Sequence, residues 1–87
     1  VAEFADRLRA AERSREALGV VLDDCRAYLL VLANHAVAPD LRAKVAPSDL
    51  VQETFLEAHR HFGGFRGRSR AELLGWLRRI LECRLSN

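Results

Sequence analysis

The last third of the sequence combines arginine with aromatic residues. Residues 60–87 hold 7 basic and 2 acidic side chains, a net charge of +5, whereas residues 1–59 hold 7 basic and 10 acidic side chains, a net charge of −3. Phe65 and Trp76 lie inside the basic segment, and all of its basic residues are arginine. Aromatic rings stack on unpaired bases and arginine binds phosphate, so the segment is typical of a surface for single-stranded nucleic acid. A solvated arginine-rich helix is the alternative interpretation.

A second group of polar residues lies on one face of a predicted helix over residues 47–62. At 100° per residue, Leu56 falls in the middle of a face that is otherwise polar. The polar members of this face are Asp49, Gln52, Glu53, Glu57 and Arg60. An apolar centre with a polar rim is typical of a small protein-binding patch. A plain solvated helix face stays open as the alternative.

The sequence offers no arrangement for catalysis or metal binding. It contains no nucleophile paired with a base and no phosphate-binding loop, and His59 and His61 are two residues apart, which places them on different faces of a helix. We therefore expect no enzyme activity, no catalytic residues, no metal and no cofactor. Cys25 and Cys83 are too few for a disulfide framework and are expected to be reduced thiols, which favours a cytoplasmic protein.

The elements that position these residues are predicted to be helices. Hydrophobic residues make up 49% and charged residues 30% of the 87 residues, which is ordinary for one globular domain, and no apolar run approaches the ~18 residues of a membrane span. The fold class is therefore expected to be all-α, a bundle of about four helices. The predicted helices cover residues 2–14, 15–37, 47–62 and 69–87, with a loop over 63–69. Pro39 ends the second helix, and Ser69 with Glu72 forms a capping box for the last.

Helical spacing also predicts the core. Val51, Phe55, Ala58 and Phe62 form one stripe, and a second stripe consists of Leu73, Leu77 and Ile80, flanked by Leu74 and Leu81. Trp76, Arg79 and Cys83 follow a flank of the last helix. Two alternatives remain open at this point: Trp76 as ordinary core packing, and Phe65 as a hydrophobic anchor for the loop.

Three motifs in order resemble region 2 of extracytoplasmic-function sigma factors of the sigma-70 family. They are residues 49–58 (DLVQETFLEA), 65–69 (FRGRS) and 76–81 (WLRRIL), within a match over about residues 47–85. The resemblance implies a transcription initiation factor domain whose helix 47–62 binds the clamp helices of the RNA polymerase β′ subunit. It places Asp49, Gln52 and Glu53 in that contact, with Leu56 and Arg60 on the same face.

The resemblance also implies a promoter-binding surface. In the family the loop, here residues 63–69, captures a base flipped from the single-stranded non-template strand of the minus-ten element, and the next helix separates the strands. The implied DNA-binding residues are Phe65, Arg66, Gly67, Arg68, Ser69, Trp76, Arg79 and Cys83. An anti-sigma protein is a further implied partner. Because the family reads the upstream promoter element with another domain, we expect this domain alone to bind promoter DNA weakly.

Two positions depart from the family pattern. Cys83 stands where the family often has Asn, a better hydrogen-bonding partner for bases, and Ala46 stands where it often has Asp ahead of Pro47. The first departure leaves minus-ten base preference open. It also favours an alternative function, a helical interaction module without promoter activity that binds polymerase or an anti-sigma protein.

Overall fold

The computed structural model describes residues 2–41 and 43–86, and this part of the chain contains helices and no β-strand. The elements in order are α1 (Ala2–Arg13), α2 (Arg15–Asp23), α3 (Arg26–Ala36), the short 3-10 helix η1 (Pro39–Leu41), α4 (Pro47–His61), the 3-10 helix η2 (Phe62–Gly64) and α5 (Arg70–Ser86). The all-α prediction is confirmed, with five α-helices among the described residues instead of about four.

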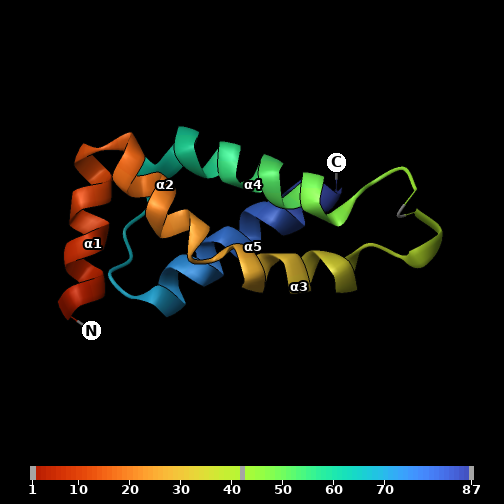
Figure 1. The fold of residues 1–87 in the computed structure, drawn as a ribbon, viewed down its shortest axis with the longest axis horizontal. Coiled ribbons are helices and arrows are strands. Elements are labelled where there is room, and N and C mark those ends of the chain that lie inside the picture. The colour runs from red at the N-terminus through yellow and green to blue at the C-terminus, as the bar shows by residue number, and fades with distance from the viewer. Residues whose placement is uncertain (1, 42, 87) are drawn as a thin grey trace.

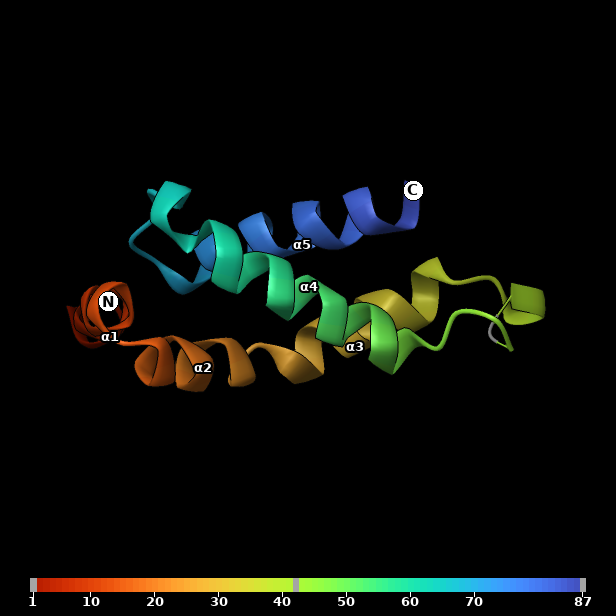
Figure 2. The ribbon, with the colours of Figure 1, turned by 90° about the horizontal axis from the view of Figure 1, so that it is seen from above.

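The helices form an elongated bundle of 42 × 22 × 18 Å. α4 packs against both α5 and α3, and α1 packs against α2. Figures 1 and 2 show α1 across one end of the bundle, beside the connection from η2 to α5, while η1 lies at the opposite end. This arrangement brings the N-terminal helix next to the predicted DNA-binding loop.

The prediction of a single helix over residues 15–37 is wrong at residues 24 and 25. There the N–H of Cys25 donates to the carbonyl of Leu22 over 2.9 Å, a tightened turn that separates α2 from α3. Aspartate has a low helix propensity, and the Asp24 carboxylate is paired with Arg7 of α1. Asp24 and Cys25 keep right-handed helical dihedrals, so α3 continues directly from α2, with the change of direction that Figure 1 shows.

Side chains at the helix starts explain two of the boundaries. The Ser14 hydroxyl accepts the N–H of Ala17 over 3.1 Å, so Ser14 caps α2 and does not end α1 as predicted. At α5 the N–H of Glu72 donates to the Ser69 hydroxyl over 3.1 Å, and the Glu72 carboxylate accepts the N–H of Ser69 over 3.2 Å. The predicted capping box is therefore confirmed.

The core lies where the predicted stripes of α4 and α5 meet α2 and α3. The α4 stripe is confirmed, since Val51, Phe55, Ala58 and Phe62 are all buried. On α5 the buried residues are Leu73, Leu77 and Leu81, whereas Ile80 is only partly buried. The buried stripe of α5 therefore has a spacing of four residues and ends at Leu81, whereas the predicted stripe ended at Ile80. α5 presents this stripe to α4 and α3, the helices it packs against.

Within the described residues, no helix combines the length and apolar character that crossing a lipid bilayer requires.

Candidate protein-binding and nucleic-acid interfaces

The outer surface of α4 carries the predicted protein-binding residues, which we call the carboxylate face. Its members are Asp49, Gln52, Glu53, Leu56 and Arg60, and all five are exposed. Leu56 is 44% exposed, a large apolar side chain held in contact with water. The structure therefore brings these residues together on one helix surface, as helical spacing predicts.

Two members of this face have ion-pair partners that the sequence analysis did not assign. Arg60 donates to Glu57 over 2.6 Å, and this hydrogen bond lowers the pKa of the half-buried Glu57. Glu53 pairs with Arg84 of α5 over 3.0 Å. The second contact connects the carboxylate face to the helix that carries the predicted DNA-binding residues.

The loop after η2 rests on three aromatic rings, which we call the aromatic cluster: Phe62, Phe65 and Trp76. The Phe65 centroid lies 5.7 Å from that of Phe62 and 5.1 Å from that of Trp76, and the Phe62 and Trp76 centroids are 6.1 Å apart. Phe62 is buried, while Phe65 and Trp76 are half-buried against the core. Phe65 does anchor the loop, and only parts of its ring and of the Trp76 ring remain available to a ligand.

Hydrogen bonds fix the backbone of the loop. The Glu72 carboxylate accepts the N–H of Arg68 over 2.8 Å and the hydroxyl and N–H of Ser69, both over 3.2 Å. The Arg68 N–H, followed by the Ser69 hydroxyl, lowers the pKa of Glu72. At the other end of the loop, the Arg66 guanidinium donates to the carbonyl of Gly63 over 2.7 Å. The loop conformation is therefore set before any ligand binds.

Gly67 sits in this loop at a position where a side chain does not fit. A Cβ atom there would lie 2.5 Å from the Phe65 ring and 2.7 Å from the Cβ of Glu72. No described glycine has a positive φ, so the requirement for glycine comes from close packing and not from backbone conformation. Glycine at residue 67 therefore has a steric basis in the packing of the loop, and its contact with DNA stays a prediction.

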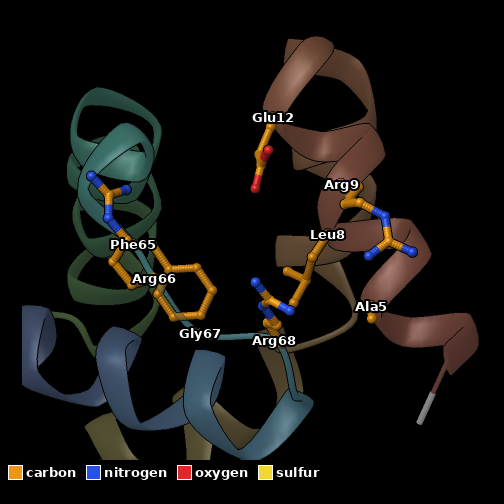
Figure 3. A pocket seen from close by; sticks show the side chains of 8 residues that line it. All are labelled: Ala5, Leu8, Arg9, Glu12, Phe65, Arg66, Gly67 and Arg68. Atoms are coloured by element: carbon orange, nitrogen blue, oxygen red, sulfur yellow. The ribbon is translucent and has the colours of Figure 1, made fainter.

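A cavity of about 300 Å³ separates the loop from α1, and we call it the loop cavity. One wall consists of Phe65, Arg66, Gly67 and Arg68, four of the predicted DNA-binding residues. The other wall consists of Ala5, Leu8, Arg9 and Glu12 of α1, shown in Figure 3. The sequence analysis missed the α1 wall, because α1 lies far from the loop in sequence and carries no motif.

The remaining predicted DNA-binding residues lie outside this cavity. Ser69 caps α5, and Arg79 and Cys83 are exposed further along that helix. At a rise of about 1.5 Å per residue, Cys83 is about 10 Å beyond Trp76 along the helix axis. The structure therefore brings Phe65 and Trp76 together but leaves Cys83 at a distance from the loop.

The described residues contain no group of three or more His, Cys, Asp or Glu side chains that could hold a metal ion. Cys25 is buried in the core and Cys83 is exposed, and both are free thiols.

Comparison with known proteins gives no match: no protein-family model, no curated protein and no solved structure is significantly similar to this chain. The resemblance to sigma factors therefore rests on the three sequence motifs alone.

Proposed function

We propose that this chain is a promoter-recognition domain of a bacterial transcription initiation factor. In this proposal the carboxylate face binds the clamp helices of the RNA polymerase β′ subunit, and the loop cavity captures an unpaired base of the minus-ten element. The observation that carries the proposal is the loop itself, a pre-ordered segment with two exposed arginines that forms one wall of a cavity.

Three features support nucleic-acid binding at the loop. The volume of the loop cavity lies at the lower end of the range of about 300–1,000 Å³ for small-ligand sites. Gly67 lets the Phe65 ring pack closely against the start of α5, which holds that ring at the wall of the loop cavity. Capturing a flipped base costs a few kcal/mol of lost stacking, and a loop that is already ordered adds little further entropy cost.

Charge and exposure support protein binding at the carboxylate face. Leu56 supplies an exposed apolar centre, and Asp49, Gln52 and Glu53 supply acidic and amide groups around it. Such a face complements a basic partner helix and accelerates the encounter between the two proteins. The clamp helices are basic in the polymerases that sigma factors of this type bind.

The DNA part of the proposal is tested by the salt dependence of binding to a single-stranded minus-ten oligonucleotide. Replacing Arg66 and Arg68 by Ala should reduce affinity and flatten the slope of log K against log salt by roughly 0.7 for each lost phosphate contact. A Lys44→Ala/Arg78→Ala variant removes the same charge from surfaces that do not border the loop cavity. An unchanged slope in the Arg66/Arg68 variant would remove the loop from the DNA site.

The polymerase part is tested by the affinity of the chain for bacterial core RNA polymerase. Replacing Gln52 and Glu53 by Ala should weaken that affinity at least tenfold without unfolding the protein, because both side chains are exposed. Glu16→Ala, which removes one negative charge from the exposed surface of α2, is the control. Equal affinities of the parent and the Gln52/Glu53 variant would show that polymerase binds elsewhere.

Two observations favour a second candidate function. The rings of Phe65 and Trp76 are partly used in the aromatic cluster, and Cys83 lies beyond the loop cavity. Both facts suit a helical interaction module that binds polymerase or an anti-sigma protein without reading DNA. Retained polymerase binding with no salt-dependent DNA binding would select this second function.

A further inference from the structure

Glu12 places a carboxylate at the loop cavity. It lies in the last turns of α1, and Figure 3 shows its side chain directed from α1 into the gap that the loop faces. Among the residues that the structure describes, the Glu12 side chain has no hydrogen bond or ion pair. Arg9 on the same wall differs, because it pairs with Asp6 and its guanidinium points away from the loop.

A carboxylate at this position weakens the binding of a DNA strand that contacts the cavity only through its phosphates. The loop supplies Arg66 and Arg68 for phosphate, and a negative charge across the cavity repels the same ligand. The repulsion is offset only when the ligand presents a hydrogen-bond donor to the carboxylate, which when ionised can only accept hydrogen bonds. Glu12 is therefore suited to contact a part of the ligand that donates a hydrogen bond.

The four bases differ in whether they can donate a hydrogen bond from an exocyclic amino group. Cytosine carries an exocyclic amino group, which a Glu or Asp side chain can accept from, whereas thymine has a carbonyl oxygen at the equivalent ring position. A thymine carbonyl oxygen held against a carboxylate is a repulsive element of the kind that gives specificity, and thymine can offer the carboxylate a donor only by shifting to its ring N3–H. Adenine and guanine also carry exocyclic amino groups.

The remaining wall residues fit a base in this orientation. Leu8 and Phe65 are apolar, and the part of the Phe65 ring that is not buried suits the flat face of a base. The Arg68 guanidinium has no ion pair within the described part of the chain and points towards Leu8 (Figure 3). It is therefore available for the phosphate attached to a base whose amino edge faces Glu12.

We propose that α1 forms the second wall of the base-capture site and that Glu12 is its specificity-determining residue, selecting an unpaired base with an exocyclic amino group against thymine. This inference rests on the proposed function, since it takes single-stranded DNA as the ligand of the loop cavity. It adds a preference for one chemical class of base and assigns that preference to a helix outside the three motifs.

The test compares two fluorescent 12-mers, one of deoxycytidine and one of deoxythymidine, by anisotropy titration of the 87-residue chain at low salt. The two strands carry the same phosphates and similar rings, so the amino group is the main difference between them. We expect the cytidine strand to bind about fivefold to tenfold more tightly, the lower part of the range for a base contact of this kind.

The Glu12→Gln variant is the decisive comparison. A Gln amide both accepts and donates, so it can bond either base, and the preference should fall below about twofold. Glu3→Gln makes the same charge change on the same helix outside the loop cavity, and it should keep the preference of the parent.

Each other outcome overturns the inference in a distinguishable way. Equal, salt-dependent binding of both strands by the parent would remove base selection and leave the proposed function intact. A preference for cytidine that persists in Glu12→Gln would assign it to another residue. Absence of binding to both strands would overturn the inference together with the DNA part of the proposed function.

Discussion

The carboxylate face and the loop cavity are built in opposite ways. The carboxylate face comes from one helix, α4, whose geometry alone sets the spacing of its side chains. The loop cavity needs α1 and the segment before α5 to meet, two parts of the chain that are far apart in sequence. The first surface therefore depends on local structure, and the second depends on the packing of the whole bundle.

This difference has a consequence for mutation. Residues of the carboxylate face contribute little to the core, so their replacement should change binding and leave stability nearly unchanged. Residues behind the loop cavity belong to the aromatic cluster or to the hydrogen bonds of the loop, so their replacement should change stability and binding together.

The largest expected effect comes from Trp76. Trp76→Ala removes a half-buried ring from the aromatic cluster and should lower the free energy of unfolding by about 2–3 kcal/mol, below the range for fully buried aromatic residues. Leu56→Ala on the carboxylate face should change it by less than about 0.5 kcal/mol. Urea denaturation measures both, and equal losses would contradict the contrast between the two regions.

A smaller effect is expected at the glycines of the loop. Gly67→Ala forces Phe65 or the start of α5 to move and should cost about 1–3 kcal/mol, with reduced binding to single-stranded DNA. Gly64→Ala is the matched control, since a Cβ there meets no atom within 4 Å. If the two variants unfold at the same urea concentration, the close packing at Gly67 does not constrain the loop.

The ion pair between Glu53 and Arg84 joins the carboxylate face to the end of α5 that lies away from the loop cavity, and it should have a smaller effect still. Both side chains are partly exposed, so Arg84→Ala should change the free energy of unfolding by less than about 1 kcal/mol. The variant releases Glu53 for a basic partner, so affinity for core polymerase should rise by up to about fivefold. A fall in that affinity would show that Arg84 itself contacts polymerase.

The smallest expected effect is the response to acid, which should differ between the loop and α4. Glu57 and Glu72 both have lowered pKa values, so each stabilises the folded state above its unfolded pKa of about 4.3, and this contribution is lost as pH falls through the lower folded pKa. Protonation of Glu72 weakens its bonds to Arg68 and Ser69. The protection of those two amides against exchange, measured by NMR relative to the intrinsic rate at each pH, should fall, while protection along α4 stays unchanged.

A Glu72→Gln variant provides the control for that titration. Its loop amides should show low protection at all pH values, because the charged acceptor is absent. Loop amides that respond to pH equally in parent and variant would mean that another group controls the loop.

Sequence reasoning predicted the features that local rules determine. The α4 stripe and the Ser69–Glu72 capping box follow from helical spacing and from cap chemistry, and both are confirmed. The break at residues 24 and 25 was missed because it is accompanied by contacts with Arg7 and Arg70, which only the packed bundle supplies. The α1 wall was missed for the same reason, and so was the pairing of Glu53 with Arg84.

Binding of nucleic acid at the loop and not at the carboxylate face can be measured by an NMR titration of the ¹⁵N-labelled chain with the deoxycytidine 12-mer. We expect chemical-shift changes at the amides of residues 65–69, at Glu12 and at the Trp76 indole, with none at Gln52 or Glu53. Changes centred on α4, or spread evenly over the arginine-bearing surface, would contradict this expectation.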